Sequence, residues 1–365
     1  MTSITFDPYE GLDWSSIADP NNTGNPPRCQ LHAHPRGTEI TTPDNVIDLY
    51  TQNRSDREGN QVQEKYTIVT ANVGRGLKQF WPWENLSEID ADWEDRDPEQ
   101  LGVIAFPSNE VANRNHTQAW FWAGHDADIP WGGFPESIRG PLDRDHLGFP
   151  EPVTAFAHPS SYYDDLPKDG EPFRFNVEKR SREDGLIGTE VYGRRNSTPT
   201  DKRDVDVWDY LLQEFSSDNI VFGFSVDDAD ASSYEVGDAV DLGFVSVLLE
   251  SEEFDPADQL EARSAAQACF KEGRLLSHKR DQWDPDAESP PAVPMVDSIS
   301  VSDSEIQINA TNYDEIRWYS GLKNQVHAGS EFDPSDAESR YVRAEIWTES
   351  EDAVTLTQPW GIDQS

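Results

Sequence analysis

Residues 29–35 of this chain read CQLHAHP. His32 and His34 are two positions apart, and side chains with this spacing point to the same face of an extended strand. Two imidazoles on one face converge on one point, as a metal site requires. An exposed strand with two solvated histidines is the plainer interpretation of the pair alone. The residues further along the chain therefore decide between the two interpretations.

The chain is strongly acidic. Of its 365 residues, 70 are Asp or Glu and 29 are Lys or Arg, which gives a formal net charge of −41. Self-repulsion at this charge destabilises a compact state in dilute buffer, whereas concentrated salt screens it. The acidic residues are spread along the chain and 11% of all residues are aromatic, which is typical of a folded protein and not of a disordered acidic tail. The composition therefore predicts a halophilic source and a high-salt cytoplasm.

The composition also argues against several classes of protein. No basic run is present to bind phosphate backbones, which argues against a nucleic-acid-binding protein. Metal ions in a site would supply local positive charge, so a nucleic-acid substrate stays an open alternative. Two cysteines, Cys29 and Cys269, do not make a disulfide framework. We find no apolar run near the roughly 18–20 residues of a membrane span and no signal peptide at the start. We therefore expect a cytoplasmic protein without a membrane partner. The sequence does not indicate its oligomeric state.

Apolar runs and helical spacing alternate through the middle of the chain. Strands are predicted at residues 66–71, 101–107, 116–123, 152–159, 188–192 and 220–226, and helices at residues 42–50, 205–215 and 257–273. Strands that alternate with helices are typical of a parallel β/α architecture. In a β/α barrel the active site lies at the C-terminal ends of the strands, where this chain places polar side chains.

The chain divides into three predicted parts. Residues 1–28 are a polar, proline-containing lead-in without regular structure, and residues 29–289 hold the alternation of strands and helices. Over residues 290–365 apolar residues alternate with polar ones, as at Ile306 and Ile308, which is typical of antiparallel strands. We therefore expect a small C-terminal antiparallel β-sandwich domain, which we interpret as a capping module without chemistry.

Six residues near the predicted strand ends form the candidate site. They are His32, His34, Glu110, His116, His158 and Asp228. Imidazole and carboxylate groups together suit Mn²⁺, Zn²⁺ or Fe²⁺ rather than Ca²⁺, and one carboxylate shared by two ions is common in phosphate-ester hydrolysis. Plainer interpretations stay open: a buried hydrogen-bonded His158, a solvent-facing His116 and a solvated acidic turn at Asp228.

Short motifs follow one another along the chain in a recognisable order. They are LHAH at residues 31–34, PSNE at residues 107–110, FAHP at residues 156–159, EVY at residues 190–192 and FSVDDAD at residues 224–230. This order resembles that of the PHP (polymerase and histidinol phosphatase) family of metal-dependent phosphoesterases, over roughly residues 29–280. The resemblance implies a distorted (β/α)7 TIM-like barrel over residues 29–289, with the metals at the C-terminal ends of its strands.

The resemblance also implies two complete ligand sets. The first ion would take His32, His34, Glu110 and Asp228, and the second would take Glu110, His116 and His158. The family's Thr-Asp-His motif reads Thr70-Ala71-Asn72 here, and the other two donors of a third ion are also absent. We therefore predict two ions bridged by Glu110 and an empty or weakened third position, which Asp230 or Glu39 would partly fill.

These residues predict a phosphoesterase. Two divalent ions, Mn, Zn or Fe, would activate a water that attacks a small phosphorylated substrate, with catalytic roles for Glu110, His158 and Asp228. Arg36 and Arg75 follow candidate site strands and would hold the phosphate by bidentate hydrogen bonds, unless they are ordinary surface arginines. The alternative is a catalytically impaired member of the family that acts as a metal-binding or ligand-binding module. A purely structural acidic domain is the third hypothesis.

Overall fold

The structure is a computed structural model. It describes residues 2–35, 43–55, 61–73, 81–82, 93–111, 116–123, 149–162, 185–193, 196–214, 220–230, 240–282, 290–302 and 304–364. Strands make up most of the regular structure in these residues.

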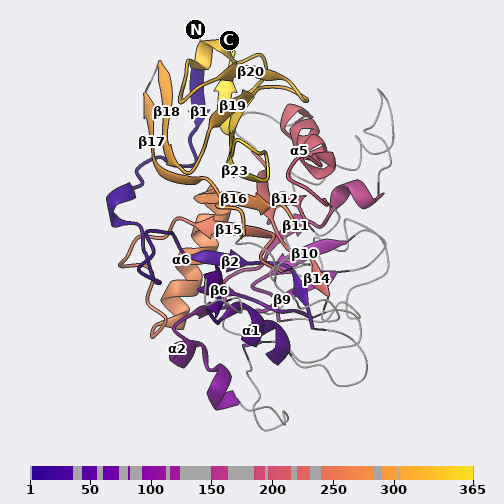
Figure 1. Ribbon diagram of the computed structural model, residues 1–365, viewed down its shortest axis with the longest axis vertical. Helices are drawn as coiled ribbons and strands as arrows, with labels where there is room; N and C mark the ends of the chain where they lie inside the picture. The colour runs from indigo at the N-terminus through magenta and orange to yellow at the C-terminus, as the bar shows by residue number, and fades with distance from the viewer. Residues whose placement is uncertain are drawn as a thin grey trace.

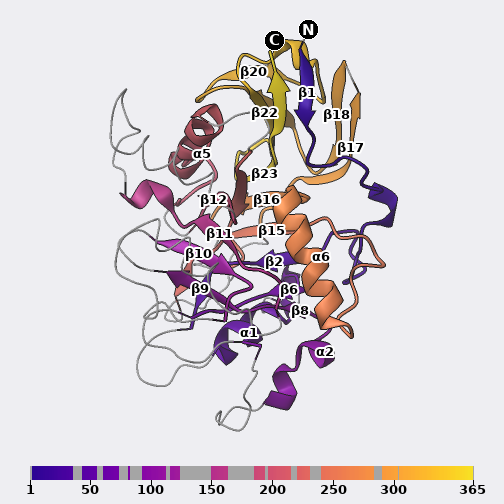
Figure 2. The same ribbon diagram turned by 180° about the vertical axis from the view of Figure 1, so that it is seen from behind.

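The largest sheet has eleven strands and contains both ends of the chain. Its main path runs through β1 (Ser3–Phe6), β24 (Trp360–Asp363), β22 (Tyr341–Trp347), β23 (Ala353–Thr357), β16 (Leu275–Arg280), β15 (Gly243–Val247), β2 (Arg28–Gln30), β6 (Ile68–Val69) and β8 (Ile104–Ala105). Two further strands belong to it, β19 (Glu315–Tyr319) and β20 (Gln325–Ala328). Figures 1 and 2 show both termini at the same end of the molecule, beside the C-terminal strands.

The second sheet has six strands and supplies most of the candidate site. Its order is β13 (Phe222–Ser225), β12 (Leu186–Tyr192), β11 (Val153–Phe156), β10 (Thr117–Trp120), β9 (Ser108–Val111) and β7 (Asn72–Val73). Three smaller sheets pair β14 (Ala229–Asp230) with β3 (Ala33–His34), β4 (Arg54–Ser55) with β5 (Gln61–Gln63), and β18 (Glu305–Thr311) with β17 (Met295–Ser302) and β21 (Glu331–Phe332).

The helices of the described residues cover these sheets from several sides. The α-helices are α1 (Asp44–Tyr50), α2 (Pro98–Leu101), α5 (Arg203–Glu214) and α6 (Gln259–Glu272), and short 3-10 helices lie at Trp14–Ser16, Trp93–Arg96, Pro159–Tyr162 and Pro334–Asp336. In Figure 2, α6 lies along β15 and α5 lies beside the C-terminal strands. No described helix is long and apolar enough to cross a membrane.

The predicted (β/α)7 barrel is wrong. The main paths of the two large sheets are open, ending at β1 and β8 and at β13 and β7, and no barrel closes within the described residues. β10 runs antiparallel to both β9 and β11, whereas a β/α barrel needs parallel neighbours. Because β9 ends at Val111 and β10 begins at Thr117, the connection is too short for the crossover helix that parallel strands require. Parallel pairing is present in β2–β6–β8 and in β11–β12–β13.

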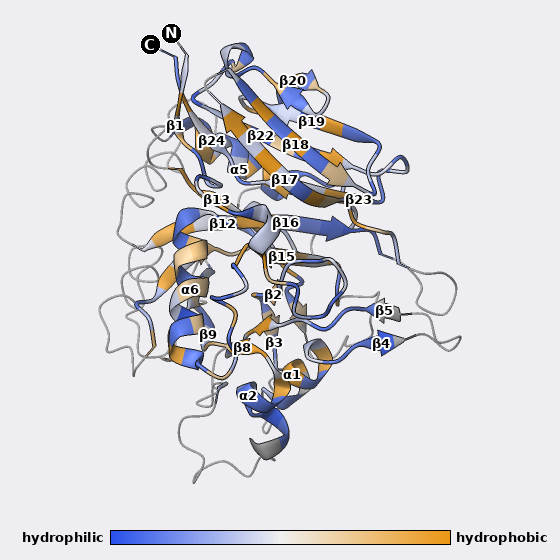
Figure 3. Cartoon of the chain, turned by 90° about the vertical axis from the view of Figure 1, so that its left-hand side faces the viewer, coloured by the Kyte–Doolittle hydropathy of each residue, from blue (hydrophilic) through white to orange (hydrophobic). Residues whose placement is uncertain are grey.

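The C-terminal strands pair antiparallel and continue the large sheet. Along β17, β18 and β22, hydrophobic and hydrophilic residues alternate (Figure 3), and Ile306 and Ile308 are buried. β23 pairs with β16, with Thr357 opposite Leu276, and β1 pairs with β24. The large sheet therefore crosses residue 290, and the division of the chain at residues 28 and 289 stays a prediction.

An aromatic core holds α6 against strands of both large sheets. The ring of Phe270 on α6 lies 6.1 Å from Phe106, 5.8 Å from Trp120 and 6.1 Å from Phe224, measured between ring centroids. Burying each aromatic side chain removes about 150–250 Å² from water. This core fixes β8, β10 and β13 relative to one another, and these strands lead into the candidate site.

Candidate metal centre

The six-stranded sheet and the two-stranded sheet of β3 and β14 bring the six candidate residues together. His34 lies on β3 and Glu110 on β9, while His158 lies two residues after the end of β11 at Phe156. The parallel pair β3–β14 places Ala229 opposite Ala33, so Asp228 lies next to the histidine strand. The antiparallel pair β9–β10 places Gln118 opposite Glu110.

The first donor group consists of His32, His34 and Asp228, with one oxygen of Glu110 beside them. The His32 and His34 Nε2 atoms lie 2.9 Å apart. Glu110 Oε2 lies 3.1 Å from His34 Nε2 and 3.7 Å from His32 Nε2. Asp228 Oδ1 lies 3.3 Å from His32 Nε2 and 3.7 Å from His34 Nε2.

These distances match the size of a coordination shell. Ligands about 2.0 Å from a tetrahedral ion lie about 3.3 Å from one another. Five of the six distances among the four donor atoms, namely those that involve at least one histidine nitrogen, range from 2.9 to 3.7 Å and so bracket that value. The spacing of His32, His34 and Asp228 therefore suits a transition-metal ion, and Glu110 Oε2 lies within 3.7 Å of both histidine nitrogens.

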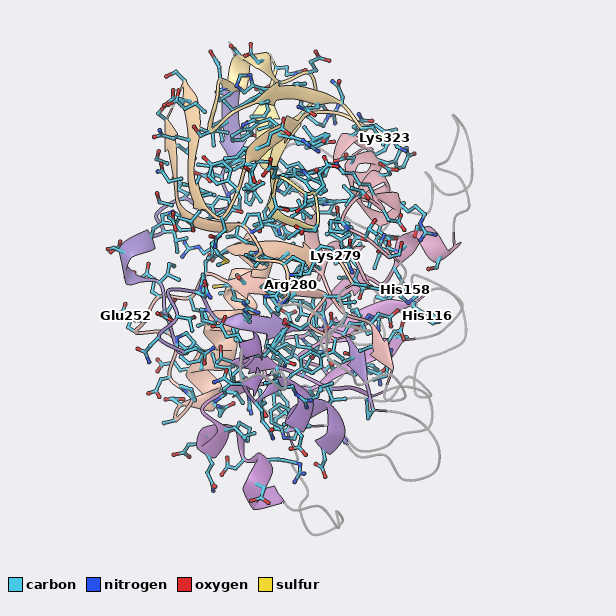
Figure 4. All side chains as sticks on the ribbon, viewed as in Figure 1. His116, His158, Glu252, Lys279, Arg280 and Lys323 are labelled. Atoms are coloured by element: carbon cyan, nitrogen blue, oxygen red, sulfur yellow. The ribbon has the colours of Figure 1, made fainter. Side chains whose placement is uncertain are left out.

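The second donor group consists of Glu110, His116 and His158. Glu110 Oε1 lies 2.5 Å from His116 Nδ1 and 2.9 Å from His158 Nε2. Figure 4 shows His116 and His158 next to each other at one side of the molecule. The two oxygens of Glu110 therefore face different groups, with Oε2 toward the first and Oε1 toward the second.

Hydrogen bonds outside the groups fix the tautomers of the first two histidines. His32 Nδ1 lies 2.7 Å from Glu190 Oε1, and His34 Nδ1 lies 3.4 Å from the backbone oxygen of Asn72. An ionised carboxylate and a carbonyl only accept, so both Nδ1 atoms donate. In the neutral rings both Nε2 atoms then carry lone pairs that face each other across 2.9 Å, and a cation between them removes the repulsion. The donor chemistry therefore fits a metal ion.

Electrostatics favour positive charge in the same place. Burial alone would lower the pKa of His32, but the carboxylates of Glu190, Asp228 and Glu110 raise it well above its usual value. Burial alone would raise the pKa of Glu110, but His32 and hydrogen bonds from His116 and His158 lower it well below its usual value. Glu110 is thus ionised at neutral pH, and its negative charge demands cations around it.

Two candidate residues have a left-handed backbone, which non-glycine residues rarely adopt. The φ angle is 29° at His158 and 49° at Asp228. Left-handed backbone costs about 1–2 kcal/mol per residue and is held in place by its surroundings. The backbone N–H of His158 donates to Glu190 Oε2 at 2.7 Å, which is one such restraint.

The neighbouring residues Asp227 and Asp228 have different roles. The buried carboxylate of Asp227 accepts from the backbone N–H groups of Asp241, Leu242 and Gly243 and from the hydroxyl of Tyr50. Burial is the main reason why the pKa of Asp227 rises to about 6. Asp227 anchors the turn, and Asp228 belongs to the first donor group.

The described part of the chain has no further donor set, beyond these two groups, for a third ion. Two groups of three or more His, Cys, Asp or Glu converge there, the two described above. Asn72 accepts from the backbone N–H of Ala33 at 3.1 Å and donates to Gln118 Oε1 at 2.5 Å, so its amide supports β3. The backbone of Asp230 pairs with His34. Arg36, Glu39 and Arg75 lie outside the described residues.

Sequence reasoning missed the roles of Glu190, Asn72 and Asp227. Glu190 was part of a motif without a role, although it is a glutamate in a strand whose seven residues are all buried. A buried carboxylate needs hydrogen-bond donors or cations, but the burial of Glu190 is known only from the folded chain. The roles of Asn72 and Asp227 depend on contacts between segments far apart in sequence, which no local pattern contains.

Comparison with protein-family models, with curated proteins and with solved structures gives no match for this chain.

Proposed function

We propose that this protein is a metal-dependent phosphoesterase that uses two divalent ions bridged by Glu110. The position of Glu110 is the observation that carries the proposal. Its Oε2 lies 3.1 Å from His34 Nε2 and its Oε1 lies 2.9 Å from His158 Nε2. A single carboxylate between two donor groups is the arrangement by which proteins hold two ions about 3.5–4 Å apart for phosphate-ester hydrolysis.

The donor atoms narrow the choice of metal. Imidazole nitrogens with carboxylate oxygens suit Mn²⁺, Zn²⁺ or Fe²⁺. The first position would have four protein donors, namely His32, His34, Asp228 and Glu110. The second would have three, Glu110, His116 and His158, which leaves a place for water or substrate. Bound ions supply Lewis acidity, which makes water more acidic and offsets the charge of a phosphoryl group.

The side chains supply binding, orientation and a proton acceptor. Glu110, Asp228 and the four histidines would hold the ions, and Glu190 fixes the ring of His32 through Nδ1. Asp228 is the most exposed of the three carboxylates at the centre, with 15% of its side chain accessible against 9% for Glu110 and 1% for Glu190. We therefore assign proton acceptance to Asp228, with His158 orienting the reacting water.

The order of the motifs supports a PHP-like phosphoesterase with a small phosphorylated substrate. This support rests on the motifs alone, because the barrel that the family would imply is not the fold found here. The acidic composition supports action in a high-salt cytoplasm.

Metal content tests the proposal directly. The protein is purified in concentrated salt without chelator, loaded with Mn²⁺, Zn²⁺ or Fe²⁺, and its bound metal is counted. We expect two equivalents in the wild type, one in His116→Ala and none held tightly in Glu110→Ala. Glu64→Gln is the matched control, because Glu64 is a buried carboxylate that pairs with Arg28. A folded wild type that binds no divalent ion contradicts the proposal.

Hydrolysis then separates an enzyme from a metal-binding module. Generic phosphomonoesters and phosphodiesters are offered to the loaded protein, and Asp228→Asn is compared with the wild type. We expect turnover that falls by about 10²–10⁴-fold in Asp228→Asn, as for a lost general base. Two bound ions with no turnover of any ester would favour the catalytically impaired alternative.

A further inference from the structure

The turn that carries His158 is held by two carboxylates from other parts of the chain. His158 belongs to the second donor group and has a left-handed backbone, with a φ angle of 29°. Its backbone N–H donates to Glu190 Oε2, and two residues later the backbone N–H of Ser160 donates to Asp204 Oδ1, both at 2.7 Å. Left-handed backbone persists only where its surroundings hold it. These hydrogen bonds supply two such restraints, one at His158 itself and one just after it.

Asp204 lies where a carboxylate is costly. It is 1% exposed, and it is the second residue of α5, 44 positions after Ser160 in the sequence. A buried carboxylate costs free energy unless hydrogen bonds or cations compensate it, so packing alone does not explain an aspartate here. The N-terminal end of a helix favours a negative charge, and the N–H of Ser160 supplies a hydrogen bond. Asp204 therefore ties the His158 turn to the first turn of α5.

Another side of α5 is anchored to the C-terminal strands. Asp209 accepts two hydrogen bonds from the guanidinium group of Arg343 on β22, at 2.7 and 2.9 Å, and Arg343 is 1% exposed. A bidentate pair of carboxylate and guanidinium fixes both the distance and the orientation of its partners. Trp208 Nε1 also donates to the backbone oxygen of Val221 at 2.9 Å. α5 is therefore held on several sides, and a shift of the helix would break buried contacts.

The geometry of a helix explains how α5 joins these regions. Asp204 and Asp209 are five residues apart, which places them about 7.5 Å apart along the helix axis and about 140° apart around it. One side chain therefore reaches the His158 turn while the other reaches β22. Figures 1 and 2 show α5 between the C-terminal strands and β12, and Leu211 of α5 belongs to the same buried cluster as Leu356 of β23.

From these observations we propose that Asp204 is a positioning residue for His158 and thereby for the second ion of the metal centre. This role rests on the proposed two-ion function. With the turn held at His158 and at Ser160, the imidazole is aimed at Glu110, whose Oε1 lies 2.9 Å from His158 Nε2. Residues that orient metal ligands in this way set the affinity for the metal. Asp204 acts through the backbone of Ser160 and belongs to neither donor group.

This role predicts a selective effect on one of the two ions. His158 belongs to the second donor group alone, and the three residues of the first group are different ones. Asp204 reaches the site through the His158 turn. Loss of its restraint should therefore weaken the binding of the second ion and leave the first in place, whereas a general loss of stability would weaken the binding of both.

Titration of the full chain with Mn²⁺ in concentrated salt tests this role, with the free ion measured by electron paramagnetic resonance. We expect Asp204→Ala to bind the first Mn²⁺ as the wild type does and the second about 10–100-fold more weakly. Asp204→Asn removes the same charge but keeps an oxygen for the N–H of Ser160, so we expect it to restore most of the lost affinity. Asp206→Ala is the matched control, with wild-type binding expected, because Asp206 lies in the same helical turn and pairs with Lys323.

Hydrogen exchange gives a second measurement that needs no variant. Because coupling between two sites is reciprocal, the second Mn²⁺ should strengthen the hydrogen bond between Ser160 and Asp204 in the wild type. We therefore expect the backbone N–H of Ser160 to exchange more slowly with two ions bound than with one. An exchange rate that the second ion leaves unchanged would overturn the role of Asp204.

Three results of the titration would also overturn it. They are a second Mn²⁺ that binds Asp204→Ala as tightly as the wild type, an equal weakening of both ions, and an Asp204→Asn variant as weak as Asp204→Ala. Thermal melting checks that each variant is folded during the titration. In all of these cases the wild type still binds two ions, so the two-ion function stands. A wild type that binds no second ion contradicts that function itself, and the role of Asp204 with it.

Discussion

Glu190 contacts both donor groups although it belongs to neither. Its Oε1 accepts from His32 Nδ1 and its Oε2 accepts from the backbone N–H of His158, both at 2.7 Å. Glu190→Gln replaces one acceptor oxygen by an NH₂ donor. If the NH₂ faces His32, the proton of that ring moves to Nε2 and the lone pair for the ion is lost. If it faces His158, the NH₂ group and the backbone N–H of His158 are both donors, and their hydrogen bond is lost.

We therefore expect Glu190→Gln to weaken metal binding by about 10–100-fold, as is typical of residues that orient metal ligands. Competition titration with a chelator of known affinity measures the effect without any need for turnover. Glu64→Gln serves again as the buried control, with wild-type metal affinity expected. Wild-type affinity in Glu190→Gln would show that it does not position the ligands.

Lys279 offers a test of pH dependence away from the metal centre. It is 1% exposed on β16 and lies in the middle of the molecule (Figure 4), and burial lowers its pKa to about 8. The unfolded value is about 10.4. Between these values the unfolded chain binds more protons than the folded chain, so this group makes stability rise as the pH increases.

Lys279→Met removes that group and its pH dependence. Between pH 8 and pH 10, we expect the free energy of unfolding of the wild type to rise by on the order of 1–3 kcal/mol relative to that of Lys279→Met. Denaturant unfolding at several pH values measures the difference, with Lys271→Met as the exposed control. A difference that stays constant over this pH range would contradict the low pKa.

At the scale of single residues, the sequence indicated which candidate donors converge, but it did not indicate the residues that support them. The two-residue spacing of His32 and His34 is a local property, and it favoured one shared face. The order of the other donors came from a resemblance. The role of Glu190 depends on His32, which is 158 positions away in the sequence, and on His158, which is 32 positions away. Only the folded chain reveals these contacts.

The C-terminal end of α6 gives a prediction at the scale of an element. Gly273 has a φ of 73°, and a Cβ at this position would overlap the ring of Phe222. Gly273→Ala therefore brings two costs, the left-handed backbone of about 1–2 kcal/mol and the displacement of a core ring. Gly11 has a φ of 74° with nothing within 4 Å of an added Cβ, so Gly11→Ala brings the first cost alone.

The difference between the two variants isolates the contact with Phe222. We expect Gly273→Ala to lower the free energy of unfolding by about 1–3 kcal/mol more than Gly11→Ala does, within the range for overpacked cores. Equal losses in urea unfolding would mean that the Phe222 ring moves aside freely.

Helices were easier to predict than the pairing of strands. The helices expected at residues 205–215 and 257–273 are found at Arg203–Glu214 and Gln259–Glu272, because helical spacing and end signals are local. The apolar segment around Thr117–Trp120 is a strand, but its pattern is the same for either direction. Its antiparallel pairing with β9 and β11 is incompatible with the predicted barrel. The direction of pairing depends on contacts between separate segments, which a local pattern does not contain.

At the scale of the whole molecule, the protein holds some of its charges inside the fold and the others on its surface. Among the described residues, four basic side chains are buried, namely Arg28, Lys279, Arg280 and Arg343, with 1–6% exposed. Their charges act within the fold, as in the pairs of Arg343 with Asp209 and of Arg280 with Asp241. Buried pairs are screened little by salt, whereas exposed charges are screened strongly. The exposed charge of this protein should therefore respond to salt, and its internal pairs should not.

This separation predicts a steep dependence of stability on salt. Raising KCl from 0.1 to 1 M shortens the Debye length from about 10 to about 3 Å, so repulsion among surface carboxylates falls and the thermal midpoint rises, most steeply below about 1 M. Glu252→Gln/Glu349→Gln removes two exposed charges, and Glu252 lies at the edge of the molecule in Figure 4. We expect the variant to melt above the wild type at 0.1 M KCl and together with it at 2 M. If the two melting temperatures differ equally at both salt concentrations, surface repulsion is not what the salt relieves.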